Sequence, residues 1–459
     1  MSGSRLLRRV GVLLALTVVY VVAGKLGLRL AFVHASATGV WAPTGITLAA
    51  FLTLGYEVWP AILLGAFLVN LTTAGSLATS IGISIGNTLE GLVGAYLVIR
   101  FAAGRRAFLR APDALRFAIV AGLIATTVSP TVGVTTLSVA GFARWTDFGS
   151  IWLTWWLGDA VGAVVVAPVL LLWSADLRVR WNEGQLLEAA VLLVSLVFSA
   201  LVVFGGVSAP GIRNYPLEFL CMPFLIWAAF RFGPREVATV IVVLSVIAIA
   251  GTVHGFGPFV RQSENESLLL LQAFMGVTSV MSMALAVVVS EHRHVEDQLR
   301  RLAVSDALTG LANYRQLIEV LEGEIKRCQR TGRGFAVLFF DLDGLKRIND
   351  RHGHLVGSRA LCRVADAIRA SSRVIDTGVR YGGDEFALIL PETGEAAAWQ
   401  VATRLTERLA ADGEKPKLSV SVGVAVYPRD GDTVEVLLSA ADRLLYEAKA
   451  HATGKAARR

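Results

Sequence analysis

Charged residues and cysteines are both scarce in this chain of 459 residues. Only 17% of the residues are charged and 54% are hydrophobic, a balance too apolar for an ordinary soluble protein. The three cysteines, Cys221, Cys328 and Cys362, lack metal-type spacing and give no sign of a disulfide framework, so we expect buried free thiols. The composition therefore indicates that most of the chain lies in a membrane.

Long apolar segments recur through the first 290 residues, and each is long enough to span a bilayer, or nearly so. They are Val10–Ala23, Ala37–Leu54, Val58–Thr73, Leu77–Ile99, Phe117–Ala140, Ile151–Trp173, Leu186–Val203, Leu217–Phe230, Val237–Val253 and Leu268–Ser290. The pattern predicts a polytopic, all-α membrane bundle of about ten helices, with about eight as the lower bound. No clear cleavage site follows the first segment, so we expect an uncleaved helix there rather than a signal peptide.

Lysine and arginine gather in a few short loops, and this predicts the orientation, because cytoplasmic loops carry an excess of these residues. With ten spans, the basic loops that include Arg5, Arg105 and Arg231 all lie inside, and so does the C-terminal domain. Lys25 and Arg29 fall on the opposite side. We expect a bacterial inner-membrane protein. The formal charge of +7 is explained by these loops, so nucleic acid is not an expected partner.

Several polar side chains lie within the apolar segments, where a polar group is costly unless it faces a partner or a cavity. They are Asn70, Asn87, Glu90, Asp159 and Glu218. Asn70, Glu90 and Asp159 form the candidate sensor site. The simpler interpretation is that these groups form hydrogen bonds between helices, with Glu218 at the membrane surface.

Local patterns in the same segments are more specific. They are Trp41-Ala-Pro-Thr-Gly45, Gly65-Ala-Phe-Leu-Val-Asn70, Gly86-Asn-Thr-Leu-Glu90, Trp156-Leu-Gly-Asp159 followed by Ala167-Pro168, and Trp227-Ala-Ala-Phe-Arg-Phe-Gly233. Together they resemble the bacterial membrane-associated sensor domain of the first type. The resemblance covers roughly residues 10 to 290 and implies an integral membrane sensor domain, which we place at residues 1–290. It does not fix a ligand.

The composition changes at residue 291 to a charged segment with apolar residues at Val295, Leu299 and Leu302. This spacing places three apolar side chains on one helical face. We expect a signalling helix over residues 291–304, which continues the last membrane helix and pairs with a second copy. A solvated spacer is the alternative.

The last third of the chain predicts a compact α/β domain. Its apolar runs predict strands at Phe335–Phe340, Val379–Tyr381, Phe386–Leu390 and Leu418–Val426, and Asn313 can cap the first of the intervening helices. The first strand ends at Asp341. The next two flank Gly382-Gly383-Asp384, where backbone without Cβ atoms allows a phosphate to approach closely. Carboxylates beside that space are natural ligands for magnesium.

Five motifs in this part are hard to explain by structure alone. They are Asp306-Ala-Leu-Thr-Gly310, Asp341-Leu-Asp-Gly-Leu-Lys-Arg-Ile-Asn-Asp350, Arg380-Tyr-Gly-Gly-Asp-Glu-Phe386, Ser421-Val-Gly-Val-Ala425 and Ala441-Asp-Arg-Leu-Leu-Tyr-Glu-Ala-Lys449. They resemble the GGDEF family of diguanylate cyclases. The resemblance implies a palm-like, mainly antiparallel sheet flanked by helices over residues 305–459. It also implies that a homodimer condenses two GTP molecules to cyclic di-GMP, with release of two pyrophosphates.

The resemblance further implies a role for each matching residue. Asp341, the Leu342 carbonyl and Asp384 hold magnesium or manganese; Asp384, Glu385 and Lys346 are catalytic; Asn349, Ser358, Gly382, Gly383 and Lys449 bind GTP; and Arg373 with Asp376 forms an inhibitory product site. Arginine matches the O6/N7 edge of guanine, and aspartate accepts from its nitrogen donors.

The chain departs from the family pattern at Ser358, where a carboxylate usually receives the guanine hydrogens. Serine both donates and accepts, so it discriminates less strongly against adenine. One alternative is therefore a synthase of mixed cyclic GMP-AMP dinucleotides. A second is a catalytically weak GTP or cyclic di-GMP receptor, and a third is a transporter with an accessory nucleotide domain. The tail through Lys455 is also longer than the usual pattern, which puts a phosphate role for Lys455 in doubt.

Overall fold

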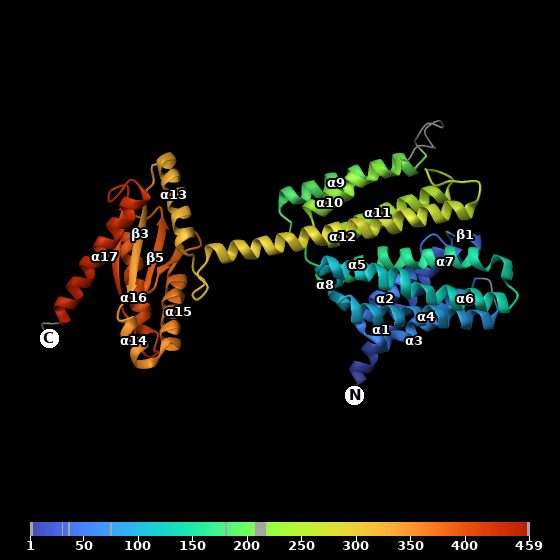
Figure 1. Ribbon diagram of the computed structural model, residues 1–459, viewed down its shortest axis with the longest axis horizontal. Coiled ribbons are helices and arrows are strands. Elements are labelled where there is room, and N and C mark those ends of the chain that lie inside the picture. Colours follow the sequence, from blue (N-terminus) through green and yellow to red (C-terminus); the bar gives the residue numbers. More distant parts are fainter. Residues whose placement is uncertain are drawn as a thin grey trace. The chain divides into compact units, whose positions relative to one another are not determined.

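The computed structural model describes residues 3–29, 31–34, 37–73, 76–179, 181–206 and 217–456. The chain divides into two compact units, Met1–His294 and Val295–Arg459, and each is described by itself (Figure 1). The boundaries predicted at 290 and 304 both fall in helix α12 (Glu264–Val304), which is continuous.

The first unit is helical apart from a small two-stranded ribbon, β1 (Ala31–His34) with β2 (Ala37–Thr38). Its helices before α12 are α1 (Gly3–Arg29), α2 (Ala42–Leu54), α3 (Trp59–Leu71), α4 (Leu77–Phe101), α5 (Ala111–Phe117), α6 (Val128–Val139), α7 (Phe148–Val161), α8 (Ala167–Ala175), α9 (Glu183–Phe204), α10 (Met222–Arg231) and α11 (Pro234–Val253). A π-helical segment, Gly162–Val166, joins α7 to α8, so the two form one long apolar helix.

Seven helices of the described residues are long and apolar enough to cross a membrane. They are Leu6–Arg29, Leu77–Phe101, Ala111–Val139, Trp145–Ala175, Glu183–Phe204, Pro234–Val253 and Glu264–Glu296. The other three predicted segments contain α2, α3 and α10, which have only 13, 13 and 10 residues. The predicted membrane bundle is confirmed. A full span takes about 20 residues, so α2, α3 and α10 are too short to be counted among the seven candidate spans of the described residues.

Glycines bring the α2, α4 and α7–α8 backbones unusually close together. A Cβ on Gly162 would lie 2.1 Å from the carbonyl oxygen of Trp41, and one on Gly45 would lie 2.4 Å from that of Gly162. On α4, a Cβ on Gly91 would lie 2.2 Å from the Thr47 methyl group. Small residues are the usual means of close helix packing in membranes, and here they form the centre of the first unit.

The second unit is built around a four-stranded sheet with the strand order β4-β5-β3-β6. The strands are β3 (Phe335–Leu342), β4 (Thr377–Gly382), β5 (Glu385–Pro391) and β6 (Val420–Tyr427), and each neighbouring pair is antiparallel. The helices are α13 (Tyr314–Thr331), α14 (Leu345–His352), α15 (His354–Ser371), α16 (Glu395–Ala411) and α17 (Val434–Ala456). The predicted α/β fold with an antiparallel sheet is confirmed.

Helices cover both faces of this sheet. Alternate side chains of a strand point to opposite faces, so Phe335 and Phe339 pack with α13 and α17, whereas Ala336 and Phe340 pack with α15 and α16. Every residue of β3 is buried, which explains its continuous apolar run. The Asn313 side chain accepts a hydrogen bond from the Gln316 amide at 3.1 Å, and this is the predicted cap of α13.

Candidate functional site

A tight turn between β4 and β5 leaves its backbone open to a ligand. Gly382 pairs with Glu385, so Gly383 and Asp384 are the two turn residues. Gly383 has a φ of +46°, the region that favours glycine. A Cβ on either glycine would meet no atom within 4 Å. The turn therefore offers the close approach that its sequence predicts.

The strand register brings the predicted acidic residues to one end of the sheet. Asp341, the penultimate residue of β3, is the direct partner of Glu385 on β5. The Leu342 amide donates to the carbonyl of Asp384 at 3.0 Å. The side chain of Asp341 is buried, with 7% of the residue exposed. Four residues predicted for catalysis or metal binding therefore lie together.

Negative charge is crowded at this end of the sheet. Burial raises the pKa of Asp341; Lys449, whose Nζ lies 2.6 Å from Asp341 Oδ2, opposes the rise, and Asp384 adds to it. Burial also raises the pKa of Glu385, and Asp341 and Asp384 add to that rise. Lys449 of α17 is thus the cation that this acidic cluster contacts directly.

The donor set fits a magnesium ion that also binds substrate. Among the described residues, no three His, Cys, Asp or Glu side chains are arranged to hold a metal by themselves. The predicted set supplies two carboxylates and one carbonyl, from Asp341, Asp384 and Leu342. Mg²⁺ characteristically takes one or two carboxylates and completes its octahedron with water and substrate phosphates. Burial is the main cause of the raised pKa of Asp341, and the charge of Asp384 adds to it; a cation bound here would oppose both effects.

Three residues predicted to contact GTP come from α14 and α15: Lys346 for the triphosphate, and Asn349 and Ser358 for the base. Lys346 and Asn349 lie on α14, which begins after Gly344, and Ser358 lies on α15. A Cβ on Gly357 would lie 1.9 Å from Asn349 Oδ1. The Asn349 amide therefore lies directly on the Gly357 backbone, next to Ser358. This contact holds two of the predicted base-binding side chains in neighbouring positions.

The predicted product site lies at the other end of β4. Asp376 directly precedes the strand and Gly382 ends it, so the two are about 20 Å apart along the chain. The side chain of Asp376 is 1% exposed and accepts a hydrogen bond from the Arg373 amide at 2.6 Å. The Arg373 guanidinium donates to Thr393 Oγ1 at 2.8 Å and is about half exposed. Arg373 and Asp376 therefore lie together, apart from the catalytic turn.

Sequence reasoning missed a positioning residue, Arg380. Its Nη1 lies 3.2 Å from both carboxylate oxygens of Asp306, and its Nη2 donates to the Gly383 carbonyl at 2.7 Å. Burial tends to raise the pKa of Asp306, but hydrogen bonds from Thr309 and Arg380 together hold it below its usual value. The signal was available, because these residues open two of the five motifs. Arg380 joins the Gly383-Asp384 turn to Asp306 at the start of the domain.

Asp343 is the second carboxylate of the Asp341-Leu-Asp343 sequence, but its bonds are structural. Its two oxygens accept hydrogen bonds from the Ser419 and Ser421 hydroxyls, both at 2.8 Å. Its amide donates to the Ser419 carbonyl at 3.0 Å. Asp343 therefore ties the end of β3 to β6 and leaves Asp341 as the carboxylate at the turn.

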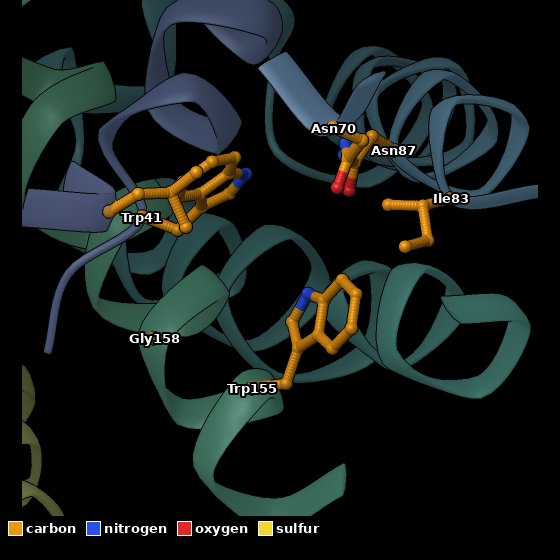
Figure 2. A pocket seen from close by; sticks show the side chains of 7 residues that line it. Trp41, Asn70, Ile83, Asn87, Trp155 and Gly158 are labelled. Atoms are coloured by element: carbon orange, nitrogen blue, oxygen red, sulfur yellow. The ribbon is translucent and has the colours of Figure 1, made fainter. Parts of the chain in front are cut away.

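In the first unit, the structure brings the candidate sensor residues to one region. Asn70 and Asn87 line a small cavity with Trp41, Ile83 and Trp155, and their amide oxygens point into the space between the two indole rings (Figure 2). Thr44 Oγ1 lies 2.8 Å from Glu90 Oε1 and 3.2 Å from Asp159 Oδ1. The simpler interpretation, hydrogen bonding between helices, thus holds in part, but it leaves a cavity and two carboxyl groups to explain.

Comparison with known proteins matches both units. Residues 12–293 match the MASE1 family model and residues 303–455 match the model "Diguanylate cyclase, GGDEF domain". The chain is 34% identical over 301 residues to the bifunctional diguanylate cyclase/cyclic di-GMP phosphodiesterase MucR of Pseudomonas aeruginosa. The matched region covers 64% of this chain and 40% of MucR. It is 38% identical over 163 residues to the diguanylate cyclase DgcP of the same organism, covering 34% of this chain and 24% of DgcP.

Among solved structures, a sensory box/GGDEF family protein from Caulobacter crescentus is 39% identical, with a TM-score of 0.31. The match covers 32% of this chain and 99% of that one. The chain spans less than half the length of the two Pseudomonas relatives. The MASE1 match alone covers more than half of the chain. The chain therefore belongs to the MASE1 family of multi-pass membrane sensors, with a GGDEF diguanylate cyclase domain following the sensor domain.

Proposed function

We propose that this chain is a membrane-bound diguanylate cyclase that condenses two GTP molecules to cyclic di-GMP under the control of its sensor domain. The observation that carries the proposal is the open turn at Gly383 and Asp384, with Asp341 paired across the sheet to Glu385. The protein works in the bacterial inner membrane with its catalytic domain in the cytoplasm. Residues 1–290 receive the signal, 291–304 transmit it and 305–459 respond.

In the proposed reaction, each subunit of a two-fold dimer binds one GTP. The open backbone at Gly382 and Gly383 admits the triphosphate, while Lys346 and Lys449 contact its oxygens. Magnesium or manganese, held by Asp341, the Leu342 carbonyl and Asp384, would neutralise charge at the α-phosphate. Electrostatic stabilisation of this kind is the main means of catalysing phosphoryl transfer.

The bonds made and broken follow from this arrangement. The 3′-hydroxyl oxygen of one GTP attacks the α-phosphorus of the other, and pyrophosphate leaves. Glu385 faces the attacking hydroxyl, where its raised pKa suits it to receive a proton. In the second half-reaction the two nucleotides exchange roles: the 3′-hydroxyl oxygen of the second attacks the α-phosphorus of the first, the second pyrophosphate leaves and the ring closes. Both half-reactions need two copies of the site, which is why the proposal includes a homodimer.

Base recognition rests on Asn349 and Ser358. The Asn349 amide presents a donor and an acceptor, a pattern that suits guanine. Ser358 can serve either guanine or adenine, so a mixed cyclic GMP-AMP product is the second candidate outcome, and Ser358 is the observation that favours it.

Arg373 and Asp376 form the proposed inhibitory site for cyclic di-GMP. Arg373 is about half exposed and carries a fork of donors that matches the guanine O6/N7 edge. The paired carboxylate of Asp376 keeps one buried oxygen without a hydrogen-bond partner. A guanine N–H donor would satisfy that oxygen, so the product and these two residues fit chemically.

The test is to incubate the purified full-length protein with Mg²⁺ and GTP, ATP or both, and to identify the products by mass. Cyclic di-GMP from GTP supports the proposal, and a guanine-adenine hybrid makes Ser358 the position that sets selectivity. An Asp384→Ala variant should lose activity, whereas the matched control Asp432→Ala, at an exposed position, should keep it. Nucleotide binding without any product, in a confirmed dimer, would replace the cyclase with a receptor.

A further inference from the structure

Two carboxyl groups lie side by side at the centre of the first unit. Glu90 of α4 is 3% exposed and Asp159 of α7 is fully buried. The Thr44 hydroxyl contacts both, at 2.8 Å from Glu90 Oε1 and 3.2 Å from Asp159 Oδ1. A hydroxyl has a single proton to donate. Thr44 can therefore satisfy only one of the two carboxylates at a time.

Three atoms of this region are buried without a hydrogen-bond partner. They are Glu90 Oε2, Asp159 Oδ2 and Asn87 Nδ2. Asn87 is 7% exposed and its oxygen accepts from the Ser129 hydroxyl at 2.6 Å. Its amide also lines the cavity between the indole rings (Figure 2), which has room for about one water-sized species. Buried polar atoms left unpaired are costly and call for an explanation.

The groups around the pair supply no compensating positive charge. The neighbouring side chains are Tyr20 of α1, Thr44 of α2 and Ser129 of α6, and none of them carries a positive charge. Among the described residues of this cluster, the titratable groups are Tyr20 and the two carboxyls. No ion pair of the described residues includes Glu90 or Asp159. Since two isolated negative charges cannot be buried together cheaply, the missing partner is a cation.

We propose that Glu90 and Asp159 bind one small monovalent cation, either a sodium ion or a shared proton, with Thr44 completing the site. Hydroxyl and carboxylate oxygens bind either cation. The neighbouring cavity, which Asn87 and Gly158 line, has room for about one water-sized species. With only two carboxylates, the cluster lacks the charge typical of a calcium cage. Only the signalling consequence of this site rests on the proposed function; the binding itself does not.

The carboxyl of Asp159 lies on a helix that is bonded directly to α12. Gln272 of α12 donates to the Thr154 carbonyl at 3.1 Å, and the Thr154 hydroxyl donates to Asn265 Oδ1 at 2.6 Å. The Ser279 hydroxyl donates to the Val164 carbonyl at 2.7 Å. Occupancy of the Asp159 site thus acts on the helix that α12 contacts, and α12 continues past residue 290 to Val304.

The last of these bonds has a local cause. Pro168 has no amide hydrogen, so it cannot donate to the Val164 carbonyl four residues earlier, and the chain is π-helical over Gly162–Val166. Ser279 supplies the missing donor. Such a substitute bond is how membrane helices tolerate proline, and here it couples the π-helical segment between α7 and α8 to α12.

The first experiment measures thermal unfolding of the full-length protein in detergent while sodium chloride replaces choline chloride at constant ionic strength. If sodium is the cation, Tm rises with sodium concentration, because a ligand that binds only the folded state stabilises it. If a proton is the cation, Tm rises as pH falls and sodium has no effect. The proposal would be overturned if the wild-type Tm responds to sodium and to pH no more than the Tm of Glu90→Gln and Asp159→Asn does.

The variants are Glu90→Gln and Asp159→Asn, with Glu57→Gln as the matched control at an exposed position of the same unit. Both site variants should abolish the cation response, whereas Glu57→Gln should retain it. Because a buried variant can fail to fold, Thr44→Val, which removes only the shared hydroxyl, provides a second comparison and should weaken the response. An unchanged response in folded Asp159→Asn contradicts the proposed site.

Product formation then separates this site from the cyclase. Cyclic di-GMP output that changes with the cation in the wild type, but not in Asp159→Asn, supports the coupling through α12. A Tm response without any change in output would overturn the coupling while leaving the binding site. A Tm response in a protein that makes no cyclic dinucleotide under any condition would refute the proposed function alone.

Discussion

Gly357→Ala isolates the role of Asn349 with a single methyl group. The added Cβ would lie 1.9 Å from Asn349 Oδ1 and 2.9 Å from its Cγ, distances that no folded structure tolerates, so the Asn349 side chain must move. The atoms that meet the methyl group belong to the end of a side chain, so the movement costs the fold little. It removes Asn349 from its position beside Ser358.

The expected magnitude follows from the contact that is lost. A well-placed amide contact to a base is worth about 1–3 kcal/mol, which corresponds to a rise in KM for GTP of roughly 5- to 150-fold. The free energy of unfolding should rise or stay unchanged, since alanine is favoured over glycine in a helix by about 1 kcal/mol. Steady-state pyrophosphate release and thermal unfolding measure the two effects separately.

The control is Gly323→Ala in α13, where a Cβ meets no atom within 4 Å. It gains the same helical preference and should leave KM unchanged. In the double variant Gly357→Ala/Asn349→Ala, the effect should equal that of Asn349→Ala alone, because both changes remove one contact. Unchanged kinetics in Gly357→Ala, or additive effects in the double variant, would refute the assignment of Asn349 to the base.

Three other predictions concern the turn and its surroundings. Arg380→Met removes the contacts to Asp306 and Gly383, so we expect kcat to fall at least tenfold, measured as product formed by folded protein. The pKa of Asp306 is held low, so its contribution to stability is present above about pH 4 and is lost as pH falls through the folded-state pKa; Asp306→Asn should flatten this acid limb in unfolding titrations. Lys449→Met should raise KM for GTP and, because Lys449 lowers the pKa of Asp341, move the acid limb of activity to higher pH. An unshifted acid limb in Lys449→Met would show that the 2.6 Å contact is unimportant in solution.

Strand positions were the most predictable part of the fold. The apolar run before Asp341 locates β3, and the two glycines before Asp384 locate the turn that fixes the pairing of β4 with β5. The pairing of β3 with β5, which places Glu385 opposite Asp341, came only from the structure. The motifs then locate the acidic cluster. The ion pair between Asp306 and Arg380 was not predicted: each residue opens a motif, but the sequence does not show that two residues 74 positions apart meet.

Two predicted segments are short helices because hydropathy does not show where a helix begins. The segment Ala37–Leu54 opens in β2, so α2 begins only at Ala42 and has 13 residues, and α3 begins at Trp59, with Pro60 in its first turn. Both segments are apolar throughout, so composition alone cannot distinguish them from full spans. Likewise, the sequence marks Glu90 and Asp159 as costly polar residues, but only the fold shows that Thr44, 46 and 115 positions away from them, contacts both.

The end of α12 is bonded to the catalytic turn through a short series of contacts within the second unit. The Val304 carbonyl accepts from the Asn313 amide at 2.9 Å, and the neighbouring Ala312 carbonyl accepts from the Arg380 amide at 2.8 Å. The Arg380 side chain then holds the Gly383 carbonyl. Because Gly383 is a turn residue outside the ladder pairs, it can shift without breaking the sheet. In the proposed function, a displacement at the end of α12 would act first on the backbone proposed to admit the triphosphate, and the β3–β5 pairing that holds Asp341 opposite Glu385 would stay intact.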